Sequence, residues 1–301
     1  MLWIIYVLMA YILWALVNIG DKYVVGKRIT NPYFYAVVGF FAGTISLVVL
    51  PFIDFYIPSL YILFWLFLSS LGFFAGAFLY LKAMSIEEVS RISILFNFLG
   101  IFTLILAWIF IGEKLNNMQL TAFGLWLCGS IFASLHFNAG KFKISKALIL
   151  MLTSCFFYAS YDVINRYLMV NNYISFSLIF VYLNFFILFF CSILFLSSKF
   201  RTEWKKNIQG ILDWKLILIV LGIAAFSRFG VLLHNKAVSL GPVALINVME
   251  GFQTILVFIF AGLISWLAPK YIKEEWDAKN FLLKFLALIF MVAGIVVLNV
   301  M

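Results

Sequence analysis

The chain has 301 residues, of which 66% are hydrophobic and only 11% are charged, and its mean hydropathy is +1.13. So much apolar surface cannot be buried inside one water-soluble globule, so we expect an all-α integral membrane protein. The net charge of +9 does not indicate nucleic-acid binding, because the basic residues lie in short connections between apolar runs rather than on one long face.

Ten apolar runs are long enough to cross the membrane, since a spanning helix needs about 20 residues. In chain order they lie near residues 2–20, 33–50, 60–81, 88–111, 118–137, 146–168, 174–198, 214–235, 242–267 and 281–300. All five prolines fall at the edges of these runs, where proline fits a turn or the first position of a helix. The first run lacks a basic start and a small-residue cleavage site, so we expect it to remain as the first span.

The basic residues predict how these spans are oriented. Odd-numbered connections carry most of the Lys and Arg residues, whereas even-numbered ones hold little beyond Lys114, Arg166 and Lys236. By the positive-inside rule, the odd-numbered connections lie in the cytoplasm and both termini lie outside. We therefore expect a multi-pass protein of the cell membrane.

Cysteine and histidine residues give no sign of a disulfide frame, a metal or another cofactor. Cys128, Cys155 and Cys191 all lie inside apolar runs, and we expect buried free thiols. His136 and His234 lie on different predicted helices, with no Cys or carboxylate at ligand spacing. The sequence therefore predicts no metal site.

Two pairs of similar segments indicate an internal repeat. The segment LKAMSI at 81–86 recurs as NKAVSL at 235–240, and residues 14–23 align with residues 158–167. Because five spans per copy is an odd number, the two copies must sit in opposite orientations. We predict two inverted five-helix repeats over residues 1–140 and 141–301, an architecture in which transporters bind substrate near the membrane midplane between the halves.

Several motifs of the first copy match one family. Trp14 lies eight residues before Lys22, Lys82-Ala83 ends the third run, and Gly112-Glu113-Lys114-Leu115 follows the fourth, with Gln119 and Gly124 beyond it. In these residues the chain resembles the ten-helix EamA-type branch of the drug/metabolite transporter superfamily. The second copy has Ser265-Trp266-Leu267-Ala268 where the GEKL turn would recur.

The resemblance implies a secondary transporter without a nucleotide motor, often an exporter of amino acids or related small metabolites. It also implies a cavity walled by helices one, three, four, six, eight and nine, and cytoplasmic termini, opposite to what the charges indicate. We expect a monomer that contacts membrane lipid and a small-molecule substrate, with a coupling proton or an exchanged solute as a further partner.

Three ionisable residues lie inside predicted spans, where each costs about 2.5 to 3.5 kcal/mol on insertion scales: Asp162, Arg228 and Glu250. At 1.5 Å per residue each lies roughly 9 to 12 Å below the same membrane face, so the three can meet in one layer. We expect Arg228 to bind a carboxylate or phosphate, and Glu250 or Asp162 to accept an amine or exchange a proton. The alternative is an Arg228–Glu250 ion pair that only joins two helices.

Other candidates lie on the polar faces of the same predicted helices or carry large rings. Asn247 shares a face with Glu250, Tyr158 shares one with Asp162, and Asn97 belongs to a polar stripe of the fourth run. Two roles remain possible for these polar residues: they line a cavity, or they form hydrogen bonds between helices. Trp14 and Tyr80 suit stacking on an apolar or aromatic substrate, with ordinary packing as the alternative.

Two other functions remain open. A flippase for a lipid-linked sugar would show a lateral opening between helices with a basic entrance, whereas a closed polar pocket around Arg228 favours a soluble metabolite. An intramembrane lipid-modifying enzyme is disfavoured, because the sequence has no Asp-rich cation-binding motif, no HExxH motif and no nucleophile paired with a histidine. We therefore expect a transporter rather than an enzyme.

Overall fold

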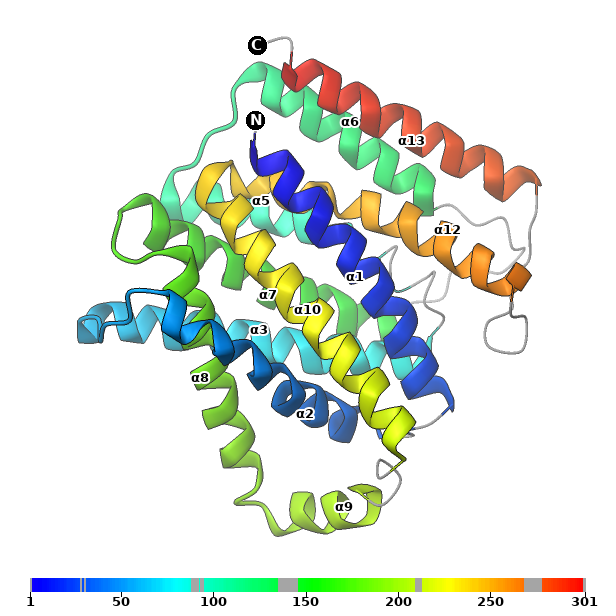
Figure 1. Cartoon of the computed structure of the whole chain (residues 1–301). Helices are drawn as coiled ribbons and strands as arrows, with labels where there is room; N and C mark the ends of the chain where they lie inside the picture. Colours follow the sequence, from blue (N-terminus) through cyan, green and yellow to red (C-terminus); the bar gives the residue numbers. More distant parts are fainter. Residues whose placement is uncertain are drawn as a thin grey trace.

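The computed structural model describes residues 2–27, 29, 31–87, 92, 95–134, 146–208, 213–267 and 278–299, and contains no strand within these ranges (Figure 1). Its elements are α1 (Leu2–Lys27), α2 (Pro32–Gly43), the 3-10 helix η1 (Thr44–Phe52), α3 (Leu60–Ile86), α5 (Phe98–Ile111), α6 (Asn117–Ser134), α7 (Lys146–Val170), α8 (Phe176–Leu194), α9 (Ser198–Ile208), α10 (Trp214–Leu240), α11 (Val243–Val248), α12 (Glu250–Leu267) and α13 (Ala278–Asn299). The predicted all-helical class is confirmed.

Six segments of the described chain are long and apolar enough to cross a membrane. They are Leu2–Val25, Pro32–Phe52, Leu60–Ile86, Lys146–Val170, Phe176–Leu194 and Trp214–Leu240. Shorter apolar helices at Phe98–Ile111, Val243–Val257 and Phe285–Leu298 fall within three of the remaining predicted runs, and α6 falls within the fourth. The chain is therefore a multi-pass membrane protein, although six rather than ten segments reach spanning length uninterrupted within the described ranges.

Interruptions explain part of that difference. The run predicted at 242–267 is divided at Met249 into α11 and α12, and the run predicted at 88–111 turns at Phe96 and Asn97 before α5 begins. In each turn an amide bonds the carbonyl three residues earlier: Leu99 N to Phe96 O at 2.8 Å, and Phe252 N to Met249 O at 2.9 Å. Within a membrane, such breaks are tolerated where the backbone is buried in protein or lines a cavity.

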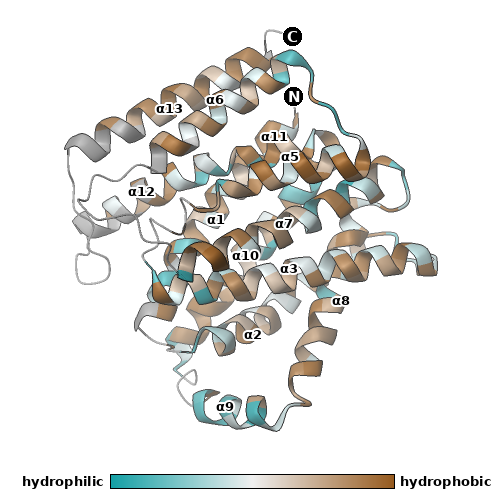
Figure 2. Ribbon diagram, turned by 180° about the vertical axis from the view of Figure 1, so that it is seen from behind, coloured by the Kyte–Doolittle hydropathy of each residue, from teal (hydrophilic) through white to brown (hydrophobic). Residues whose placement is uncertain are grey.

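The helix α9 is an element that the sequence did not predict, because its eleven residues contain no apolar run of spanning length. Its hydrophilic residues stand out in Figure 2 and include Lys199, Arg201, Lys205 and Lys206. The Trp204 ring packs against Phe34 and Phe41 of α2, with ring centroids 4.8 Å and 6.1 Å away. The run predicted at 174–198 therefore ends early, and an amphipathic helix follows it.

The long helices pack in pairs that bring distant parts of the chain together (Figure 1). Helix α1 lies along α10, α3 lies along α7, and α6 lies along α13. At the α3–α7 contact, a Cβ atom added to Gly72 would lie 2.9 Å from the carbonyl oxygen of Phe157. Glycine at this position lets the two backbones approach, which is a common basis of helix association in membranes.

Replacing Gly72 with leucine is therefore expected to destabilise the protein by about 1 to 3 kcal/mol, the usual cost of overpacking. Gly222→Leu on α10 is the matched control, because a Cβ atom there meets no atom within 4 Å. Thermal unfolding of both purified variants in one detergent compares them. Equal midpoints would show that the α3–α7 approach does not depend on Gly72.

The cysteines agree with the sequence prediction at two positions of three. All three are free thiols, and Cys155 and Cys191 are buried, but Cys128 is exposed. Helix α6 uses the neighbouring Trp126 to pack on α13, where the indole donates to the carbonyl oxygen of Met291 at 2.9 Å. Cys128 lies on a different side of that helix, so burial was wrongly predicted for it.

Candidate functional site

A cavity of about 180 Å³ lies inside the helix bundle. Helices α1, α2, α3, α5, α7, α10 and α12 all contribute to its wall. This set contains the helices that the family resemblance implied, with α2 in addition. Most of the wall is apolar or aromatic, and the polar lining residues are Asn18, Asp21, Tyr35, Tyr80, Tyr158, Tyr161, Asp162, Ser227, Arg228, His234, Glu250 and Gln253.

The structure brings most of the predicted site residues to this cavity. Trp14, Tyr80, Tyr158, Asp162, Arg228 and Glu250 line it. Asn247 is 0% exposed and lies behind the wall, bonded to Asp162. Asn97 is buried in the turn that precedes α5 and is absent from the cavity lining. The three ionisable residues singled out in the sequence therefore share one cavity.

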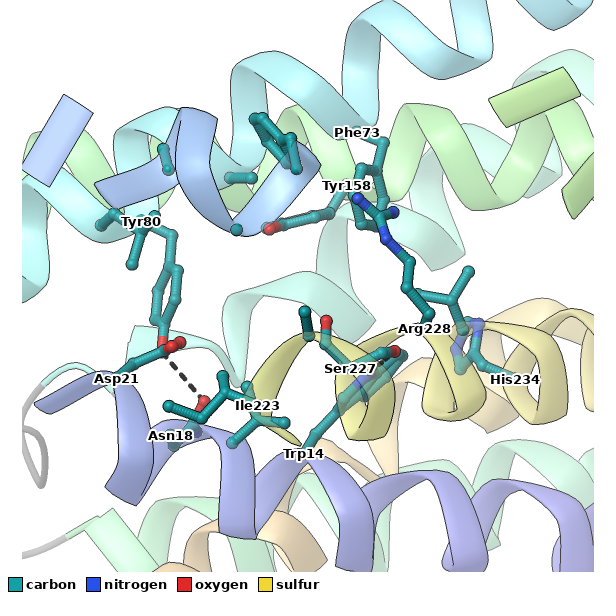
Figure 3. A pocket seen from close by; sticks show the side chains of 18 of the residues that line it. Trp14, Asn18, Asp21, Phe73, Tyr80, Tyr158, Ile223, Ser227, Arg228 and His234 are labelled. Atoms are coloured by element: carbon teal, nitrogen blue, oxygen red, sulfur yellow. Dashed lines mark hydrogen bonds between the residues drawn. The ribbon is translucent and has the colours of Figure 1, made fainter. Parts of the chain in front are cut away.

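Arg228 lies in an aromatic and apolar part of the wall (Figure 3). Its guanidinium carbon is 5.8 Å from the ring centre of Phe40 and 5.6 Å from that of Phe73, distances typical of cation–π contacts. A Cβ atom at Gly43 would collide with the Arg228 Nε atom. The guanidinium therefore fills the space above a glycine of α2.

The charge of Arg228 is not balanced by any carboxylate of the described residues. The side chain is 4% exposed, and its buried Nη1 atom has no hydrogen-bond partner. The ion pairs of the described chain join Arg166 to Glu113, Lys206 to Glu203 and His234 to Asp162. The alternative of an Arg228–Glu250 ion pair is therefore wrong for this structure.

Asp162 and His234, which line the cavity, form a buried polar network with Asn247, which lies behind them. The Asn247 amide donates to Asp162 Oδ2 at 2.7 Å and to Thr103 Oγ1 at 2.8 Å. His234 Nε2 lies 3.1 Å from Asn247 Oδ1, and its Nδ1 lies 3.5 Å from Asp162 Oδ1. Since both Asn247 amide hydrogens are used, its oxygen must accept from His234. The network joins α5, α7, α10 and α11.

Asp21 is a lining residue that sequence reasoning missed. The predicted first span ended at residue 20, but α1 continues to Lys27 and buries Asp21 to 7% exposure. Its carboxylate accepts a hydrogen bond from Tyr35 at 2.6 Å, and the nearby Asn18 accepts one from Tyr80 at 2.9 Å. Figure 3 shows Asp21 and Asn18 beside Tyr80, away from Arg228. An acidic residue one position beyond a predicted apolar boundary was the available signal.

Glu113 does more than shape the turn in which it lies. Its Oε2 accepts from Arg166 Nε at 3.1 Å, and its Oε1 accepts from the backbone N–H of Val243 at 2.9 Å. Arg166 also donates to the carbonyl oxygen of Val238 at 2.8 Å. The side chains of Glu113 and Arg166 are only 14% and 15% exposed. This contact, called the Glu113 clamp below, joins the GEKL turn to α7 and to the start of α11.

The fold and the cavity define a class: a multi-pass helical membrane protein with a cavity among its helices that carries charged side chains. Residues 1–135 match the EamA-like transporter family, which confirms the predicted resemblance over that part of the chain. No curated protein matches the chain in sequence. A protein of known crystal structure shares the fold at 14% sequence identity, with a TM-score of 0.67 over 98% of this chain and 96% of the other.

Proposed function

We propose that this protein is a secondary transporter, and not an enzyme, which moves a small metabolite with a negatively charged group, such as an amino acid or a related compound. The observation that carries the proposal is the buried, unpartnered Nη1 atom of Arg228 in the cavity wall. A buried cation without a partner is costly. A substrate carboxylate supplies that partner through charge-assisted hydrogen bonds.

Helix packing supports two inverted repeats over residues 1–140 and 141–301, with each interrupted span counted once among ten. In two such repeats, α1, α2 and α3 of the first half correspond to α7, α8 and α10 of the second. Exchanging the halves therefore turns the α1–α10 pair into α7–α3 and the α2–α10 pair into α8–α3, and all four of these pairs are in contact. The pairs α6–α13 and α5–α11 each join two corresponding helices, so the exchange leaves them unchanged, and both pairs are in contact. We propose that the halves rock around the cavity in alternating access, as inverted-repeat transporters do.

We further propose that a monomer works as an exporter, with the odd-numbered connections in the cytoplasm and both termini outside. Helix α9 supports this orientation, because it lies in an odd-numbered connection and is rich in Lys and Arg. The carboxylates of Asp162 and Glu250 are the candidates for exchanging a coupling proton, since both line the cavity. Asn97 and Asn247 act as structural partners in this proposal rather than as substrate ligands.

The flippase alternative has weaker support. A second cavity, of about 440 Å³, opens between α3, α5 and α7. Its described lining consists of apolar and aromatic residues with Ser160, and includes neither Lys nor Arg. A lipid-linked sugar carries a phosphate group, for which this wall offers no cation. The Arg228 cavity therefore supports a soluble metabolite better.

Thermal stabilisation of the purified protein in detergent tests the proposal. Amino acids, nucleotides, drugs and lipid-linked sugars are added to the native chain and to the Arg228→Ala and Arg201→Ala variants. We expect an anionic or zwitterionic metabolite to stabilise the native chain by about 2.7 kcal/mol at a hundred times its Kd. Arg201→Ala keeps that shift, because Arg201 bonds only backbone carbonyls at the end of α8, and Arg228→Ala loses it.

Two results would contradict this expectation. If Arg228→Ala keeps the full stabilisation, Arg228 is structural and the substrate binds elsewhere. If only lipid-linked sugars stabilise the native chain, the flippase reading replaces the metabolite transporter.

A further inference from the structure

The cavity holds a second unbalanced charge, at Asp21. Tyr35 donates one hydrogen bond to this carboxylate, and no Lys, Arg or His of the described chain forms an ion pair with it. Asp162 differs, because it faces His234 and the Asn247 amide. Glu250 also differs, because it is the first residue of α12, where the helix dipole favours a negative charge. Asp21 is therefore the lining carboxylate of the described chain that has neither a cation nor a helix N-terminus beside it.

The distance between Asp21 and Arg228 can be estimated along two helices, α1 and α2. On α1, Trp14 is level with Arg228, because its indole donates to the carbonyl oxygen of the adjacent Ser227 at 3.2 Å. Asp21 lies seven residues further along α1, which is about 10 Å at 1.5 Å per residue. Gly20 packs against Ile223, so the two helices run antiparallel and the register continues toward Asp21.

Helix α2 gives a second, independent measure of this separation. Tyr35 contacts Asp21, whereas Gly43 contacts Arg228. These two residues of one helix are eight positions apart, which is about 12 Å at 1.5 Å per residue. Both measures place the unbalanced cation and the unbalanced anion at separate ends of the cavity.

The wall between the two ends is apolar. It includes Val17 of α1, Ala77 of α3 and Ala224 of α10. A cavity of about 180 Å³ with charges this far apart leaves room for a narrow molecule only. An α-amino acid bears its amine and carboxylate on the same carbon, so these groups cannot reach both ends.

We propose that the substrate is an elongated zwitterion, whose anionic group binds Arg228 and whose ammonium group binds Asp21, with an apolar chain between them. This inference rests on the proposed function, because it assigns the anionic group to the same arginine. Tyr35 holds the Asp21 carboxylate in place, and the Asn18 side chain adds a hydrogen-bonding group at the same end. Asp21 is thus the residue that selects a substrate with a remote amine.

The test measures thermal stabilisation of the full chain in detergent by glycine, γ-aminobutyrate, ε-aminocaproate and caproate, which lacks the amine. We expect ε-aminocaproate to bind the native chain at least about tenfold more tightly than glycine or caproate, as calculated from the ligand dependence of the midpoint. Asp21→Asn removes the preference for ε-aminocaproate over caproate but leaves caproate binding unchanged. The amide oxygen still accepts from Tyr35, so this variant keeps the local structure.

Glu203→Gln, at an exposed carboxylate of α9 outside the cavity, is the matched control and keeps the preference. Equal binding of ε-aminocaproate and caproate by the native chain would overturn the inference while leaving the anion site at Arg228 intact. Loss of the preference in Glu250→Gln but not in Asp21→Asn would also overturn it, by placing the amine at Glu250. If none of the four acids stabilises the native chain, the Arg228 anion site itself fails, and with it the proposed function.

Discussion

Replacing Asn247 with leucine is expected to lower the free energy of unfolding by about 3 to 5 kcal/mol, because one hydrogen bond to a carboxylate and two to other buried groups are lost together. Leucine has the same branched shape and is not smaller than asparagine, so the loss comes from polar groups rather than from a cavity. The Asp162 carboxylate loses its 2.7 Å donor, and Thr103 and His234 lose their contacts with the same amide. Each group left unsatisfied in the interior adds its own desolvation cost.

Asn184→Leu is the control for this experiment. Asn184 is also an asparagine in a spanning helix, and it is 1% exposed. Its amide bonds only the Phe180 carbonyl oxygen of the same helix, at 2.8 Å. We expect a loss of about 1 kcal/mol or less, since one neutral hydrogen bond is removed. Thermal unfolding of both variants in one detergent compares them; equal losses would mean that the Asn247 network contributes no special stability.

Removing the Glu113 clamp is expected to have the second-largest effect. Glu113→Ala leaves Arg166 with only its bond to Val238 and frees the N–H of Val243. We expect a loss of about 2 kcal/mol, within the range for hydrogen bonds to charged groups, and faster hydrogen exchange at the first amides of α11. Glu113→Gln is expected to lose less, because its oxygen still accepts from Val243.

The salt bridge between Lys206 and Glu203 provides the control for the clamp. It has the same 3.1 Å separation, but its side chains are 65% and 43% exposed. Exposed ion pairs contribute about 0 to 1 kcal/mol, so Glu203→Ala is expected to change stability very little. Hydrogen exchange at α11 that is equally slow in Glu113→Ala and in the native chain would show that the clamp does not hold the start of that helix.

Apolar run length and isolated charges made much of this molecule predictable. Membrane insertion leaves few places for an ionisable side chain, so Asp162, Arg228 and Glu250 were recognisable as candidates, and all three line one cavity. The GEKL motif indicated the transporter family that residues 1–135 match. These signals depend on composition and short spacing, which a single sequence displays directly.

Features that depend on tertiary contacts were not predictable in the same way. The break at Met249 occurs in an apolar run whose proline, Pro242, is its first residue, so no proline ends the helix at Met249. Asp21 was missed because α1 continues beyond its apolar run and buries the charge against Tyr35. The absence of an Arg228–Glu250 pair depends on which way a long side chain turns, toward Phe40 and Phe73, and helical spacing does not specify that direction.

The contact between Gly43 and Arg228 links two positions that are far apart in the sequence. A methyl group at position 43 would enter the space of the guanidinium, so a larger residue there requires the Arg228 side chain to shift. The two positions should therefore covary among natural relatives of this protein. The same contact also gives a way to displace the guanidinium without changing the charge of the cavity, because Gly43→Ala moves Arg228 while leaving every ionisable group in the chain.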